Sequence, residues 1–166
     1  IWGSLTLIGF FFLLRELKFS KVSVVLGTFM LSFSFWHLDF SRTAYRAIMV
    51  SMVIIWSFYF LLRALRNSKH QLSYFLAAGA LLGLGFNSYI AFRVVPLIFV
   101  IIGIFLVITD KNLVKNYWKK ALIVFSGLLI VAFPIFVYYL DHLKEFLFRA
   151  DAVSIFNTSK MTAWQA

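Results

Sequence analysis

Six polar side chains stand out in a chain that otherwise consists mostly of Leu, Ile, Val, Phe and Met. They are Asp39, Arg42, Arg46, Asn87, Tyr89 and Arg93. Three of the six are arginines, and a guanidinium group can donate two parallel hydrogen bonds to a phosphate. These residue types predict a site that binds a phosphate group, with the other three side chains as candidate lining groups.

Arg42 and Arg46 form the closest pair. Residues four apart share one face of a helix, and serine, present at position 41, often caps a helix N-terminus. If Ser41 caps a helix, both arginines lie in its first turns, where the backbone amides also attract an anion. A second interpretation stays open, in which Arg42 pairs with Asp39 and Arg46 extends to the lipid headgroups.

Arg93 follows Asn87 and Tyr89 inside a long apolar stretch. An ionisable residue within a membrane span usually faces a cavity or a partner. Arg93 is therefore a candidate for the same pocket as Arg42 and Arg46. The alternative is again a side chain that reaches the lipid headgroups without a specific ligand.

Acid–base and metal chemistry have weaker signals. His37 and Asp39 are a possible proton-transfer pair, but an isolated Asp at a helix end is more often a cap or an arginine partner. The chain has no cysteine, and its three histidines lie in separate segments. The sequence therefore predicts neither a metal site nor a cofactor.

The composition identifies the elements that must position these residues. Hydrophobic residues make up 63% of the 166 positions and charged residues only 13%, against about 25% charged in soluble domains. Lipid must therefore surround most of the chain. The net charge of +10 does not indicate nucleic-acid binding, because the basic residues cluster between apolar runs.

The apolar runs predict an all-α fold, a polytopic transmembrane helix bundle of about six spans. The expected spans are 1–14, 22–36, 43–62, 72–86, 91–109 and 121–140 within a membrane domain covering 1–140. The stretch 72–109 is divided because a single helix would be roughly 57 Å long, far beyond a hydrocarbon core of about 30 Å. Gly79 and Gly83 indicate close helix packing in the fourth span.

The charges predict the orientation of the bundle. The segments 15–21, 63–71 and 110–120 hold ten basic residues and two acidic ones. The alternate segments hold six basic residues and four acidic ones, so the positive-inside rule places the first set in the cytoplasm. The six candidate site residues then lie towards the extracytoplasmic face.

Both ends of the chain have distinct features. Residues 141–166 begin with a helical repeat of Leu and Phe opposite charged residues, which predicts a short amphipathic helix on the outer membrane surface and the start of an outer loop. The first residue already lies within an apolar run. We therefore expect the chain to be a fragment of a longer protein.

Three stretches together resemble a known family: WHLDFSRTAYRAI, GALLGLGFNSYIAFRVVPL and FRADAVSIFN. They look like the polytopic GT-C-fold glycosyltransferases that use polyprenyl-phosphate sugars. These include protein O-mannosyltransferases, aminoarabinose transferases of lipid A and RgtA/B/C/D-like enzymes. The resemblance covers most of the chain, and the charge cluster RELKFSK fits it as well.

The resemblance implies a transferase in the plasma (inner) membrane with an extracytoplasmic active face. Its partners would be a polyprenyl-phosphate-linked sugar, the lipid bilayer and a glycan, lipid or protein acceptor. Arg42, Arg46 and Arg93 would bind the carrier phosphate, while Asp39, Asn87 and Tyr89 would line the cavity. The family's general-base Asp lies in an outer loop expected upstream of Ile1, so no residue here inherits the catalytic role.

Two other classes remain open on the sequence alone, a small polytopic transporter and a structural membrane subunit. Transporters place polar residues near the middle of the bilayer, whereas the polar residues here lie mainly at the outer ends of the spans. A purely structural subunit would tolerate lysine in place of its outer arginines, which a bidentate phosphate site would not.

Overall fold

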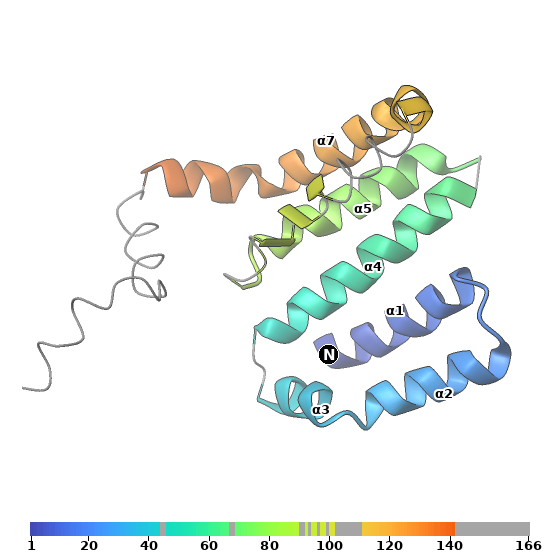
Figure 1. Cartoon of the computed structure of the whole chain (residues 1–166). Coiled ribbons are helices and arrows are strands. Elements are labelled where there is room, and N and C mark those ends of the chain that lie inside the picture. Colours follow the sequence, from blue (N-terminus) through green and yellow to red (C-terminus); the bar gives the residue numbers. More distant parts are fainter. Residues whose placement is uncertain are drawn as a thin grey trace, which may run out of the picture. The chain divides into compact units, whose positions relative to one another are not determined.

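A computed structural model of the chain divides into two compact units, residues 1–132 and 133–166. It describes residues 1–43, 46–66, 69–89, 92, 94, 95, 97, 98, 100, 101 and 111–141, and in the last range the side chains of 118–138 and 140. All the regular elements of these described residues are helical, which confirms the predicted all-α class. Figure 1 shows their course, and the helix labels follow it.

The first unit contains most of the helices. They are α1 (Trp2–Glu16), α2 (Lys21–Ser32), α3 (Phe35–Arg42), α4 (Ala47–Arg66), α5 (Gln71–Gly85) and the larger part of α7 (Lys111–Asp141). Of the second unit, the described residues are the last turns of α7, from Phe133 to Asp141. The helix and loop expected over 141–166 therefore lie outside the described residues, except for Asp141 itself.

One short connection, residues 17–20, separates α1 from α2. Lys18 adopts a left-handed backbone conformation with a φ of 62° directly after α1. Ser20 then caps α2, because its hydroxyl accepts a hydrogen bond of 3.1 Å from the amide of Ser23. The chain thus reverses within a few residues, as a hairpin of two helices requires.

α4 is the central helix of the first unit, packed against α1, α3 and α5. Its buried residues Met52 and Val53 form a core cluster with Leu82 of α5 and with Phe92, whose side chain is fully buried. On the α1 side, the indole nitrogen of Trp56 donates a 3.0 Å hydrogen bond to the carbonyl of Leu5.

α5 and α7 approach each other through glycines, as Gly79 and Gly83 predicted. A methyl group added to Gly79 would meet the carbonyl oxygen of Val124. One added to Gly83 would lie 2.7 Å from the carbonyl oxygen of Leu128, and one added to Gly127 would lie 2.7 Å from that of Leu76. Small residues allow this backbone contact, and the order of the contacts shows that α5 and α7 run parallel.

Among the described residues, two helices are long and apolar enough to cross a membrane, Ala47–Arg66 and Trp118–Tyr138. A third is possible if α2 and α3, bent by 54° relative to each other, form one span. The described residues thus give two or three candidate spans, and α5 is a shorter apolar helix. Most of the expected span 91–109 lies outside the described residues.

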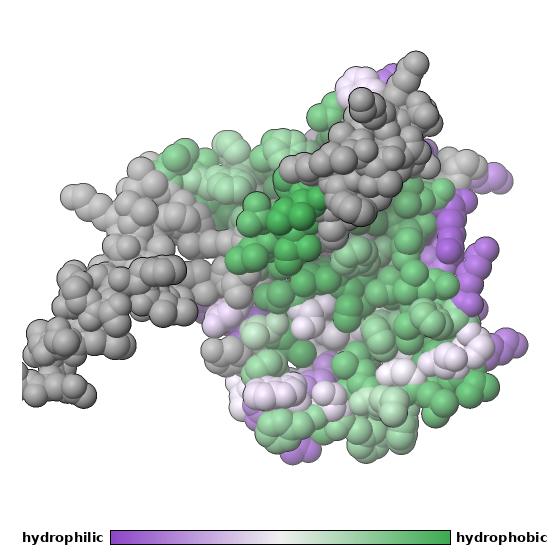
Figure 2. Space-filling model, in the orientation of Figure 1, coloured by the Kyte–Doolittle hydropathy of each residue, from purple (hydrophilic) through white to green (hydrophobic). Residues whose placement is uncertain are grey.

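The surface supports a lipid environment. Large apolar side chains on α2 and α7 are exposed, including Met30 at 74% and Ile130 at 71%. Figure 2 shows hydrophilic residues gathered at the edge where α1 and α4 end, beside a largely hydrophobic face. Exposed apolar area on this scale is typical of a membrane protein and not of a soluble one.

Candidate functional site

Helix α3 positions the polar segment around Arg42. The bend between Ser32 and Phe35 turns α3 by 54° from α2, and α3 then packs against the start of α1. Gly3 of α1 makes this contact possible, since a methyl group there would collide with the Ser41 side chain. Phe35 and Trp36 remain 71% and 65% exposed on α3.

Ser41 does not cap a helix, so the condition considered from the sequence is not met. Ser41 lies inside α3, where its hydroxyl donates a 2.6 Å hydrogen bond to the carbonyl of His37, four residues earlier. Serine makes this bond when it lies within a helix. Arg42 is consequently the last residue of α3, and Arg46 immediately precedes α4.

Arg42 and Arg46 therefore lie at the ends of two different helices. They flank a break between helices and do not share the first turns of one helix, so the argument from four-residue spacing does not hold. Arg42 sits at a helix C-terminus, where carbonyl groups favour a cation. Both side chains are exposed, and among the described residues neither forms an ion pair with Asp39.

His37 and Asp39 lie on different sides of α3. His37 is 8% exposed, and its imidazole Nε2 lies 3.5 Å from where a methyl group on Gly3 would sit. Asp39 is partly exposed, and its carbonyl group accepts hydrogen bonds from the amide and the hydroxyl of Thr43. The two side chains therefore do not form the acid–base pair considered from the sequence.

Asn87 and Tyr89 follow the end of α5. Asn87 is exposed and Tyr89 is partly buried. Ser88 between them is buried, and its hydroxyl donates a hydrogen bond of 2.6 Å to the carbonyl of Gly85. Arg93 lies outside the described residues. Phe92, the residue before Arg93, packs its ring against Gly85 at the end of α5.

The direction of the helices brings the described candidates to one end of the first unit. α4 and α5 are antiparallel, because Gln71 at the start of α5 donates a 3.1 Å hydrogen bond to the carbonyl of Ala64 near the end of α4, while Leu82 packs with Val53 farther along both helices. The start of α4 and the end of α5 therefore lie at the same end. Five candidates, Asp39, Arg42, Arg46, Asn87 and Tyr89, lie at this end, although the described residues give no contact that joins all five into one pocket.

The opposite end of the unit carries an ion-pair cluster. Glu16, at the end of α1, lies 3.4 Å from both Arg63 and Arg66 of α4. Arg66 also donates to the carbonyl oxygen of Glu16. We call this end, marked by Arg15, Lys18, Lys21, Arg63, Arg66 and Lys69, the basic end.

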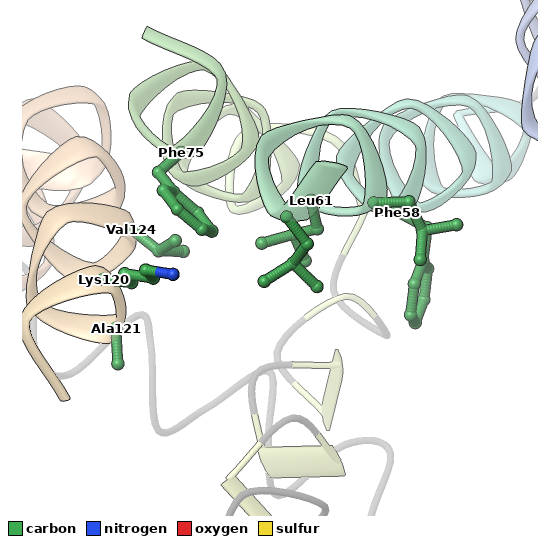
Figure 3. Close-up of a pocket in the computed structure, with 8 residues that line it drawn as sticks. Phe58, Leu61, Phe75, Lys120, Ala121 and Val124 are labelled. Atoms are coloured by element: carbon green, nitrogen blue, oxygen red, sulfur yellow. The ribbon is translucent and has the colours of Figure 1, made fainter. Parts of the chain in front are cut away.

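A cavity of about 330 Å³ also lies away from the five described candidate residues. It is formed by α4, α5 and α7 and has mainly apolar walls (Figure 3). Sequence reasoning missed both this cavity and the role of Gly3, because each depends on contacts between helices distant in sequence. Among the described residues, no three His, Asp or Glu side chains are placed to hold a metal ion.

The comparisons with known proteins agree with the helical, lipid-exposed character of the chain. A family model described as dolichyl-phosphate-mannose-protein mannosyltransferase matches residues 1–138. No curated protein and no solved structure matches the chain. The family match extends over α1 to α5 and most of α7, and so over most of the sequence. The chain belongs to the dolichyl-phosphate-mannose-protein mannosyltransferase family.

Proposed function

We propose that this chain is part of a multi-pass glycosyltransferase of the plasma membrane that takes a sugar from a polyprenyl-phosphate carrier. The observation that carries the proposal is the packing of α3 against α1. This packing places Arg42 at the same end of the first unit as Arg46. Family membership supports transferase chemistry. The two exposed guanidinium groups supply the donors that a lipid-linked phosphate needs.

The reaction is a displacement at the anomeric carbon. An acceptor hydroxyl oxygen attacks that carbon, and its proton passes to a general base. The bond from the anomeric carbon to the phosphate oxygen breaks, and the polyprenyl phosphate leaves with the bonding electrons. Arg42, Arg46 and Arg93 stabilise the negative charge that develops on this phosphate, while Asp39, Asn87 and Tyr89 contribute to the sugar and acceptor cavity.

The base itself is expected from a part of the enzyme outside the six residues. We place the reaction at the extracytoplasmic face, since the basic end then faces the cytoplasm as the positive-inside rule requires. The acceptor is a glycan, a lipid or a protein hydroxyl group.

Replacement of Arg42 by lysine in the full-length protein tests the proposal. Lysine keeps the charge but cannot donate the paired hydrogen bonds of a guanidinium group. We expect kcat/KM for transfer from a polyprenyl-phosphate sugar to fall by about a hundredfold, at the lower end of the range for loss of a transition-state donor. Arg46→Lys should have a similar effect.

Arg15→Lys is the matched control, because Arg15 is exposed at the end of α1, at the basic end. This variant should retain full transfer activity. Unchanged transfer in both Arg42→Lys and Arg46→Lys would show that neither side chain binds the phosphate. Absence of transfer by the unaltered full-length protein would instead favour a structural or transport component.

A further inference from the structure

The cavity at the basic end has one charged side chain in an apolar wall. Its described lining consists of Phe58, Leu61, Leu62 and Leu65 of α4, Phe75 of α5, and Lys120, Ala121 and Val124 of α7. Figure 3 shows the Lys120 side chain extending from α7 towards the α4 side of the cavity. The volume of about 330 Å³ is at the lower end of the range for sites of small ligands.

The position of the cavity along the helices follows from the contacts of the first unit. Its α4 residues surround Arg63 and adjoin Arg66, which pair with Glu16. α7 runs parallel to α5, so the start of its apolar stretch at Trp118 lies near the start of α5. The cavity therefore belongs to the basic end, opposite Arg42 and Asn87.

Lys120 lies near the start of a candidate membrane span. The apolar stretch of α7 begins at Trp118, two residues earlier, and that of α4 ends at Arg66. Tryptophan and terminal basic residues mark the membrane interface in spanning helices, and lysine extends its ammonium group towards phosphates while its stem stays in apolar surroundings. Lys120 lines the cavity, and we expect its charge to lie near one headgroup layer.

We propose that this cavity binds a membrane phospholipid with a net negative headgroup. The fatty-acyl chain occupies the space between Phe58, Phe75 and Val124, and the headgroup phosphate accepts a hydrogen bond from the ammonium group of Lys120. Charge complementarity selects this occupant, because the lysine adds to an end that already carries an excess of basic residues. Basic pockets between spanning helices attract anionic headgroups in this way.

The inference does not depend on the transferase reaction. A mainly apolar cavity between candidate membrane-spanning helices is not filled stably by water, so a lipid chain is a suitable occupant. A zwitterionic headgroup also carries a positive charge, so its attraction to the basic end is weaker. The expected preference is for charge at the headgroup and not for one fatty acid.

Titration of the purified full-length protein with phosphatidylglycerol, followed by native mass spectrometry, tests this site. Phosphatidylcholine with the same acyl chains is the reference lipid. We expect phosphatidylglycerol to bind about fivefold more tightly, the factor that one lysine near an anionic lipid provides. Lys120→Gln should remove most of this preference.

Lys119→Gln is the matched control, since it removes the same charge one residue away. The Lys119 ammonium lies 5.7 Å from the centre of the Trp118 ring, and Lys119 does not line the cavity. This variant should keep the preference. An equal loss in Lys119→Gln, or equal binding of the two lipids by the unaltered protein, would overturn the proposal.

Ala121→Leu tests the acyl-chain part of the site, because it fills the cavity while leaving Lys120 in place. It should weaken both lipids, whereas Leu122→Phe on the exposed side of α7 should weaken neither. Should Ala121→Leu fail to fold, the lysine pair still decides the outcome. Displacement of phosphatidylglycerol by a lower concentration of polyprenyl phosphate would assign the cavity to the sugar carrier and refute the phospholipid assignment.

Discussion

Glycine positions differ sharply in what surrounds them. At Gly79 the atoms nearest to an added methyl group are the backbone carbonyl of Val124 and the amide of Leu128. At Gly27 the nearest atom is the end of the Leu14 side chain, at 3.2 Å. Backbone atoms cannot rotate away, whereas a leucine methyl can, so the two sites should respond in opposite ways to the same substitution.

Gly79→Ala should lower the free energy of unfolding by about 1–3 kcal/mol, the usual cost of overpacking a tight contact. Gly27→Ala should leave it unchanged or raise it by up to about 1 kcal/mol, because alanine favours helix over glycine. Thermal unfolding of both variants in detergent compares them directly. Similar midpoints would show that α5 and α7 are not in backbone contact in the protein.

Ser57 is a buried hydroxyl in α4 with no hydrogen-bond partner in the described part of the chain. Ser57→Ala should therefore leave stability unchanged or raise it by about 1 kcal/mol. Ser88→Ala is the control, because that hydroxyl donates a 2.6 Å hydrogen bond to Gly85, and its loss should cost about 1 kcal/mol. A cost at Ser57 equal to that at Ser88 would indicate a partner for its hydroxyl.

At the scale of elements, the packing of α3 against α1 affects the position of Arg42 in the proposed site. The contact depends on Gly3, above which the Ser41 hydroxyl and Cβ atoms lie. α3 has only 8 residues and therefore cannot hold its own position by internal hydrogen bonds alone. The placement of Arg42 then depends on how α3 packs against α1, α2 and α4, and Gly3 allows the contact with α1.

Gly3→Ala should displace α3 and reduce transfer activity about tenfold or more, because small misplacements of binding groups lower rates strongly. The loss should exceed any change in the amount of folded protein. Adding Ser41→Gly removes both clashing atoms and should restore most of the activity, despite the cost of about 1 kcal/mol for glycine in a helix. Activity assays of the single and double variants form the cycle. Additive losses would exclude the contact as the cause.

The sequence around Ser41 shows which features of an element can be predicted. Apolar composition correctly indicated helices, and the spacing of Gly79 and Gly83 was enough to indicate a close helix contact. The break after Arg42 could not be predicted, because serine serves both as a cap and as a hydrogen-bond donor within a helix. The deciding contact, with Gly3, joins residues far apart in sequence. Similarly, no periodicity could reveal the cavity beside Lys120.

At the scale of the molecule, charge is divided between the two ends of the first unit. The basic end holds Arg15, Lys18 and Lys69, and the Glu16 cluster ties α1 to α4 there. The arginine side chains of this cluster are about 41–42% exposed, so solvent weakens these pairs and they add little to stability. We expect their larger role to be in setting the membrane orientation, since cations resist transfer across the membrane.

The predicted orientation can be tested by thiol labelling, since the chain contains no cysteine. In intact cells, a membrane-impermeant maleimide should modify Thr43→Cys and leave Lys18→Cys and Lys69→Cys unmodified. Permeabilised cells should give labelling at all three positions, which controls for reactivity. Labelling of Lys18→Cys and not of Thr43→Cys in intact cells would reverse the orientation and place Arg42 in the cytoplasm.

The glycine contact between α5 and α7 also bears on biogenesis. The ribosome completes α7 last among the described helices, and spanning helices associate only after each has entered the bilayer. The glycine face of α5 therefore has no contact with α7 until α7 has been inserted. A variant such as Gly79→Ala would slow the association of α5 with α7. Membrane quality-control proteases act on helices that remain unassociated. Cellular abundance of the full-length protein would then fall even where the purified variant still folds.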